Sequence, residues 1–320
     1  MGVLVLTRLW TMELIGEGRL RPWLGPAIRG ALAWAVKEAV CRWPPLERDD
    51  RYKTCRGCQY LGDCAYGSTF EAEGTLSEGA PSGMADGQRA ITIRPPFPVP
   101  EYGRPGDRMT LCATFLGERA AAAADVINRV LLESDRGFEL GRDRVGFRLS
   151  AYLTEKDAPG ALQCIEPEHL PASPEDCRGY VPAVRLDLIT PLFLKEEPVE
   201  GGKARAVLKP TLGQLVRGCL RTVGRAFAAF GKGLDGRVDF AGLKKSAEAV
   251  PTQAAFWQPF RQRHHSTRQR QRYDLVGVTG GAVFGRVPLC LLPWLVWGGR
   301  LGIGEHRVTG AGCWEVTLLA

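Results

Sequence analysis

The residues best suited to chemistry lie in the last quarter of the chain, in the run RQRHHSTRQRQR from Arg261 to Arg272. This run contains five arginines, the adjacent histidines His264 and His265, and no acidic residue. Arginine side chains neutralise phosphates, and imidazole is the side chain that exchanges protons near neutral pH. The run therefore predicts a phosphate-binding segment that also carries the only paired imidazoles of the protein.

A glycine-rich segment, GIGEHRVTGAG, follows this basic run. Its glycines form two pairs, Gly302 with Gly304 and Gly310 with Gly312. Glycine lets a backbone approach another group closely, so that N–H groups can cradle a phosphate. The alternative interpretation is a tight turn between a helix and a strand. The basic run a short distance upstream favours the phosphate interpretation.

Four cysteines, Cys41, Cys55, Cys58 and Cys64, follow the first expected helix. The last three form a C-x2-C-x5-C pattern, and a C-x2-C turn can place two thiolates on one metal ion. The cluster predicts a tetrahedral zinc site, with an iron–sulfur cluster or no metal as the alternatives. Because four thiolates leave no open coordination position, such a site would be structural.

Composition indicates a globular protein rather than a disordered or membrane-spanning one. The chain has 320 residues, of which 45% are hydrophobic and 24% charged, and its net charge is +7. This length favours two domains. No basic leader with a long apolar run opens the sequence, and no apolar stretch approaches the roughly 20 residues of a membrane span. We therefore expect a cytoplasmic protein whose ten cysteines are thiols or metal ligands.

Hydrophobic periodicity predicts an α+β fold made of two similar halves. The first half reads strand, helix, strand, strand, helix, strand, which is the ferredoxin-like (RRM-like, βαββαβ) order. Its expected elements are strands at Val3–Leu9, Ala90–Arg94, Met109–Leu116 and Val145–Leu153, and helices at Pro26–Val40 and Ala120–Leu132.

The second half roughly repeats this order. It has an expected strand at Ala183–Ile189, a helix at Thr211–Phe230 and a hairpin that turns at Gly280-Gly281. A short helix from Pro288 and a last strand from Cys313 complete it. We therefore predict tandem ferredoxin-like domains at residues 1–158 and 182–320, joined by a linker at 159–181. A Cys-rich insertion, residues 41–64, lies in the first domain.

Five segments of the chain resemble the Cas6 family of CRISPR pre-crRNA endoribonucleases, in the RAMP superfamily. They are LRPWLGPAIRGAL (Leu20–Leu32), CAYGSTFE (Cys64–Glu71), LDLITPLFL (Leu186–Leu194), RHHSTRQRQRYDLVGVTGG (Arg263–Gly281) and GRLGIGEHRVTGAGCWEV (Gly299–Val316). The resemblance implies binding of CRISPR repeat RNA and its metal-independent cleavage. The RNA 2′-hydroxyl would attack the adjacent phosphate, giving 2′,3′-cyclic phosphate and 5′-hydroxyl products. The crRNA and other Cas proteins are the implied partners.

The resemblance also implies roles for individual residues. Many similar enzymes carry a histidine near the first helix, but no histidine precedes His169 here. We therefore assign the catalytic imidazole to His264 or His265, and stabilisation of the phosphorane charge to Lys37. Cutting by lysine and arginine alone, or RNA binding without efficient cutting, are the other outcomes. The expected RNA-binding residues are Arg29, Arg261, Arg263, Ser266, Arg268, Arg270, Arg272, Gly302, Gly304, His306, Arg307, Gly310 and Gly312.

Two rival functions follow from the same residues. The first is a non-cleaving RAMP-type subunit that holds crRNA in a CRISPR effector complex. The second is a cysteine-metal protein whose glycine loop grips a nucleotide. This second rival is disfavoured because no lysine-serine pair of the phosphate-binding kind follows the glycines.

Overall fold

The structure is a computed structural model, and it divides the chain into two units. Unit 1 comprises Met1–Ile165 and Ala226–Gly233, and unit 2 comprises Glu166–Arg225 and Leu234–Ala320. No helix among the described residues is both long and apolar enough to cross a membrane. The described residues are 2–42, 55, 58–71, 88–140, 144–151, 162–176, 178–196, 204–234, 236–266 and 271–319, with the backbone alone for residues 265, 266, 271 and 272.

In the described part of unit 1, an antiparallel sheet is built around one long strand, β1 (Val3–Leu14). On one side β1 pairs with β5 (Arg108–Leu116), which in turn pairs with β3 (Ile91–Arg94). On its other side β1 pairs with two strands in succession along its length. These strands are β7 (Val145–Ala151) and β8 (Leu162–Ile165), and β7 also pairs with β6 (Phe138–Leu140) at the edge of the sheet. The short strands β2 (Gly18–Arg19) and β4 (Tyr102–Gly103) form a separate pair.

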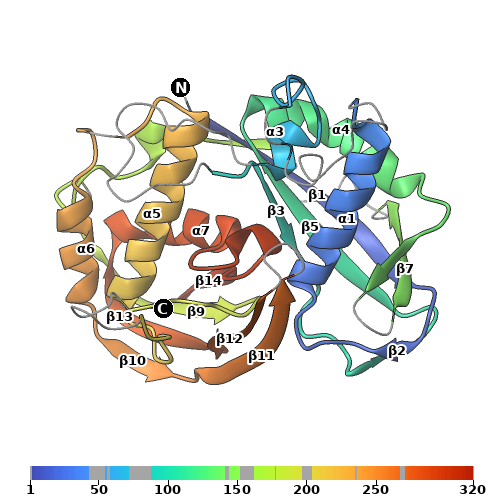
Figure 1. Ribbon diagram of the computed structural model, residues 1–320. Helices are drawn as coiled ribbons and strands as arrows, with labels where there is room; N and C mark the ends of the chain where they lie inside the picture. The colour runs from blue at the N-terminus through green and yellow to red at the C-terminus, as the bar shows by residue number, and fades with distance from the viewer. Residues whose placement is uncertain are drawn as a thin grey trace. The chain divides into compact units, whose positions relative to one another are not determined.

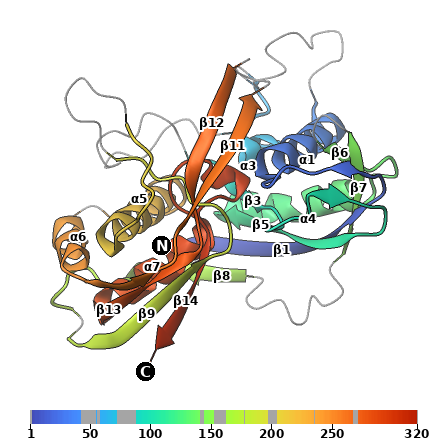
Figure 2. The ribbon, with the colours of Figure 1, turned by 90° about the horizontal axis from the view of Figure 1, so that it is seen from below.

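The helices of unit 1 cover one face of this sheet (Figure 2). α1 (Gly25–Val40) begins with Pro26 in its first turn, where the missing N–H costs no hydrogen bond. Side chains that alternate along β1, among them Trp10, Met12 and Leu14, are buried against α1, α4 (Glu118–Leu132) and the short α3 (Gly67–Phe70). On the other face, the end of β1 that carries Thr11 and Glu13 is polar, whereas Val5 and its neighbour Leu116 are buried and apolar.

In the described part of unit 2, a four-stranded antiparallel sheet has the order β10-β13-β9-β14 (Figure 1). β9 (Tyr180–Leu188) lies between β13 (Gly281–Pro288) and β14 (Trp314–Leu319), and β10 (Thr252–Ala255) pairs with β13. The helices are α5 (Leu212–Phe230), whose residues from Ala226 onward belong to unit 1, α6 (Phe240–Glu248) and α7 (Leu292–Leu301). Unit 2 also has 3-10 turns at Pro167–His169, Leu289–Leu291 and Arg307–Thr309.

The predicted hairpin at Gly280-Gly281 is wrong. The strand before Gly280 is β12 (Gln271–Thr279), which pairs with β11 (Gln258–Ser266) in a separate two-stranded ribbon. The strand after Gly280, β13, pairs with β9 in the four-stranded sheet of unit 2. Gly280 has a φ of +90° and its carbonyl accepts a hydrogen bond from the Leu188 N–H at 2.8 Å. The chain therefore changes sheets at this glycine instead of folding back on itself.

The segment predicted as a linker, 159–181, contains regular structure. Its β8 strand pairs with the beginning of β1, and its residues 167–169 form a 3-10 turn. β1 also extends five residues beyond the expected Leu9, to Leu14. Both differences arise because strand ends depend on pairing with partners that are distant in sequence.

Candidate active site

The ribbon formed by β11 and β12 positions the first two residues of the candidate site. Its register places His264 directly opposite Tyr273. Side chains at directly opposite positions of an antiparallel pair lie close enough to touch. The centroids of the His264 and Tyr273 rings are 5.1 Å apart, with an interplanar angle of 66°.

The glycine-rich loop brings a third ring to the same place. His306 has a left-handed backbone, with φ of 59°, and its carbonyl accepts a hydrogen bond from the Thr309 hydroxyl at 2.7 Å. The Glu305 N–H donates to the Phe193 carbonyl at 2.9 Å, which attaches the loop to the chain after β9. As a result the His306 ring stacks on Tyr273, with centroids 6.0 Å apart and planes at 19°. We refer to His264, Tyr273 and His306 as the imidazole–tyrosine cluster.

Charged neighbours and burial set the protonation of the cluster. Burial is the largest influence that lowers the pKa of His306; His264 and Lys195 lower it further, and Glu305 opposes them. Burial, and then the Glu305 carboxylate, raise the pKa of the Tyr273 hydroxyl. Lys195 and Glu305 form an ion pair at 2.6 Å beside the two rings. His306 is therefore a neutral imidazole at pH 7 and can accept a proton.

The lowered pKa of His306 predicts how the stability of the protein depends on pH. Unfolded histidine titrates near pH 6.5. Below that pH the unfolded state binds a proton that folded His306 resists, so the free energy of unfolding should fall as the pH drops from about 6.5 towards the folded pKa. Urea denaturation between about pH 5 and 7.5 measures this dependence. His306→Gln should flatten the profile, because it removes the group whose pKa folding lowers. An equally steep profile in His306→Gln would contradict the assignment.

Close packing within the loop accounts for three of its glycines. A Cβ atom at Gly302 would lie 2.5 Å from the Ala311 carbonyl oxygen. Added Cβ atoms at Gly304 and Gly312 would overlap the carbonyl oxygens of Phe193 and Ile303. All three also have positive φ, as does Gly310 at 83°. The tight-turn interpretation thus explains these glycines, and their contact with phosphate stays a prediction.

Arginines of the basic run lie on the same ribbon. Arg261 and Arg263 share the carboxylate of Asp274, with N–O distances of 2.5 and 3.9 Å, and their side chains are 73% and 84% exposed. Two guanidinium groups on one carboxylate leave a net positive charge, which suits a phosphate ligand. Arg268 and Arg270 lie outside the described residues, as do the side chains of His265, Ser266 and Arg272. Arg307 begins the 3-10 turn after His306.

Two expected site residues lie on α1 in unit 1. Lys37 is 2% exposed, and its Nζ atom lies 4.8 Å from the centre of the Tyr66 ring. Arg29 donates from Nη2 to the Phe70 carbonyl at 3.1 Å and lies over the Phe70 ring. Both cations are therefore engaged in attaching the segment around α3 to α1. The Lys37 side chain is enclosed by the surrounding residues, and its catalytic role stays a prediction.

The cysteine cluster is only partly described. Cys55 and Cys58 form a turn, in which the Cys58 N–H donates to the Cys55 carbonyl at 3.2 Å. Burial raises the pKa of the Cys55 thiol, and the adjacent Lys37 ammonium opposes this rise. Across the described ranges, no three His, Cys, Asp or Glu side chains converge to hold a metal ion. A zinc ion or iron–sulfur cluster held by Cys41, Cys55, Cys58 and Cys64 stays a prediction, which a zinc and iron assay of the purified protein and of Cys58→Ser would test.

Sequence reasoning missed Tyr273, Lys195 and Phe193. Tyr273 directly follows the basic run, but its position opposite His264 depends on the register of a ribbon whose partner strand was misassigned. Phe193 and Lys195 lie more than 100 residues before the loop that they contact. The Phe193 ring meets the His306 ring edge-on, with centroids 5.7 Å apart. Spacing along the chain carries no signal for such a contact.

Comparison with solved structures defines the class of fold. Over 98% of this chain and 100% of the other, the structure is similar to "Cas6 (TTHB231) product complex", with a TM-score of 0.59 and 17% identity. It is similar to "Cas6 (TTHA0078) product complex" over 98% and 99% of the chains, with a TM-score of 0.51 and 15% identity. It is similar to "Thermus thermophilus Cas6 (TTHB231)" over 98% and 99%, with a TM-score of 0.53 and 13% identity. The fold is Cas6-like.

Sequence comparison gives the family. The family model described as "AF_1859_N: N-terminal domain" matches residues 5–173, more than half of the chain, and the protein belongs to this family. No curated protein matches the sequence.

Proposed function

We propose that this protein binds CRISPR repeat RNA and cleaves it by metal-independent general acid–base catalysis. The imidazole–tyrosine cluster is the observation that carries the proposal, because it brings two imidazoles and a tyrosine together beside the Lys195–Glu305 ion pair. The Cas6-like fold supports it, since two of the similar structures are described as product complexes of Cas6. The arginine-rich ribbon supplies the positive charge that an RNA backbone requires.

The cluster suits each proton transfer of this reaction. One imidazole removes the proton from the 2′-hydroxyl of the RNA while the 2′-oxygen attacks the adjacent phosphorus. A second group gives a proton to the departing 5′-oxygen. His306, with its lowered pKa, is the acceptor, and His264 is the donor. Lys195 and Arg263 stabilise the negative charge of the phosphorane. The products are a 2′,3′-cyclic phosphate and a 5′-hydroxyl.

The proposal includes two ferredoxin-like modules. Support comes from the sheet orders of the two units, β3-β5-β1-β7 and β10-β13-β9-β14. In both sheets the first strand of the ferredoxin-like order lies between the third strand and the fourth. In unit 1, β1 lies between β5 and β7, and in unit 2, β9 lies between β13 and β14. The cysteine segment then occurs between α1 and β3, and the β11–β12 ribbon is an insertion between β10 and β13. The boundaries 1–158 and 182–320 belong to this proposal.

Incubation with RNA tests the function directly. A 5′-labelled RNA of the CRISPR repeat from the same genome should be cut in the presence of a chelator. The same RNA with a 2′-deoxy substitution at the cleaved position should bind and remain intact, because it lacks the nucleophile. Cutting that requires added metal would overturn the mechanism. A stable complex without products would overturn cleavage altogether and indicate a crRNA-holding subunit of an effector complex.

A further inference from the structure

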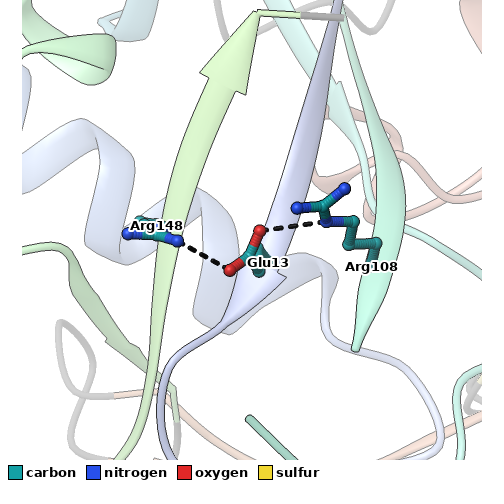
Figure 3. Close-up of polar contacts among 3 residues, drawn as sticks. All are labelled: Glu13, Arg108 and Arg148. Atoms are coloured by element: carbon teal, nitrogen blue, oxygen red, sulfur yellow. Dashed lines mark hydrogen bonds and ion pairs between the residues drawn. The ribbon is translucent and has the colours of Figure 1, made fainter. Parts of the chain in front are cut away.

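A row of charged residues crosses the polar end of the sheet face that lies opposite α1 and α4 in unit 1. Arg108 on β5, Glu13 on β1 and Arg148 on β7 are direct neighbours in the register of three adjacent strands. Figure 3 shows the Glu13 carboxylate between the two guanidinium groups. Arg108 donates from Nε at 3.0 Å and Arg148 from Nη2 at 2.7 Å, each to a different oxygen of Glu13. We refer to these three residues as the Arg–Glu–Arg row.

Hydroxyl side chains form the adjacent row of the same face. Thr110, Thr11 and Ser150 are paired in register two residues further along the strands. Thr110 and Ser150 are exposed, and the side chains of Arg108 and Arg148 are 68% and 60% exposed. Because α1 and α4 pack on the opposite face, neither helix covers these side chains. The two rows therefore present cations and hydroxyl donors side by side.

Stability alone gives a weak reason for this arrangement. Ion pairs between exposed side chains contribute little to folding. Two arginines against one carboxylate leave the row with a net charge of +1. Each guanidinium has five N–H donors, and its contact with Glu13 uses only some of them.

We propose that the Arg–Glu–Arg row is a second RNA-binding site, which takes backbone phosphates. Guanidinium groups grip phosphate oxygens in two places, and Thr and Ser hydroxyls are common donors to phosphate and sugar oxygens. A protein partner fits this face poorly, because the two rows lack the aromatic or large apolar side chains that anchor protein interfaces. The inference takes its ligand class from the proposed function and is independent of the chemistry at the imidazole–tyrosine cluster.

Fluorescence anisotropy with labelled oligouridine RNA of about 20 nucleotides tests the site in the full-length protein. Arg108→Gln combined with Arg148→Gln should weaken binding about tenfold near 100 mM salt, and should reduce the salt slope by about 1.4 for two lost contacts to a single strand. The matched control is Arg119→Gln with Arg129→Gln, an equal loss of charge on the exposed side of α4. Unchanged binding by the first pair, or an equal loss in the control, would overturn the proposal.

Two further variants separate binding from folding. Arg108→Lys with Arg148→Lys keeps a cationic partner for Glu13, so it should fold normally, keep the salt slope and lose less affinity than the glutamine pair. Glu13→Gln removes the competing carboxylate, so it should bind RNA about threefold more tightly as the net charge rises. Weaker binding by Glu13→Gln with an unchanged melting temperature would contradict the proposal.

The readouts distinguish this inference from the proposed function. Oligouridine binding is an equilibrium measurement that needs no cleavage. If repeat RNA stays intact while the Arg108/Arg148 variant loses affinity, only the proposed catalysis fails. If repeat RNA is cut and the Arg108/Arg148 variant binds oligouridine like the unaltered protein, only the second site fails.

Discussion

Replacement of His264 and His265 together by alanine should lower the rate of repeat-RNA cleavage by about 100- to 10,000-fold, the usual contribution of general acid–base groups. The variant loses the imidazole that contacts Tyr273, and with it the proton donor to the leaving oxygen. RNA affinity should change little, because Arg261 and Arg263 keep the charge of the ribbon. Single-turnover rates with saturating protein measure the first effect, and gel shifts with the 2′-deoxy RNA measure the second.

The single variants and one distant histidine sharpen this test. His264→Ala alone should account for most of the loss, since the His264 ring contacts Tyr273 in the cluster. His169→Ala changes an exposed histidine of a 3-10 turn and should cut normally. Normal cutting by the double variant would remove the reaction from this pair and leave His306, Lys37 and the arginines as the remaining candidates.

Gly312→Ala should lower the free energy of unfolding by about 3 kcal/mol, because alanine is strained at positive φ and its Cβ has no room. Gly312 has a φ of 72°, and an added Cβ would overlap the backbone oxygen of Ile303. The Gly312 N–H also donates to the Pro191 carbonyl at 2.9 Å, so displacement of this residue disturbs the attachment that positions His306. Urea denaturation measures the loss, and cleavage should fall with it.

Gly30→Ala provides a control of opposite sign. Gly30 lies on the exposed side of α1, and nothing is within 4 Å of an added Cβ. Alanine in such a helical position should stabilise the protein by about 0.5 to 1 kcal/mol. If Gly312→Ala were as stable as Gly30→Ala, the loop would have to tolerate a different backbone, and its glycines would then be available for the phosphate-binding role.

The sequence determined the elements that local interactions specify. Apolar residues at helical spacing located α1, α4 and α5 to within a few residues, because helix hydrogen bonds join residues that are four apart. Runs of β-formers located the strands β5, β9 and β14 in the same way. The sequence also showed that imidazoles and guanidinium groups are concentrated in one stretch, because the composition of a segment can be read without knowing its tertiary contacts.

Only the tertiary structure decided which strands pair and which side chains meet. β12 and β13 are separated by the single residue Gly280, yet they belong to different sheets, because β12 pairs with β11 and β13 with β9. The cluster needs that ribbon register for His264 and Tyr273, and the loop attachment at Phe193 for His306. The Arg–Glu–Arg row needs three strands in register whose residues are distant in sequence. Such contacts are selected by packing over the whole unit, and no local pattern of residues encodes them.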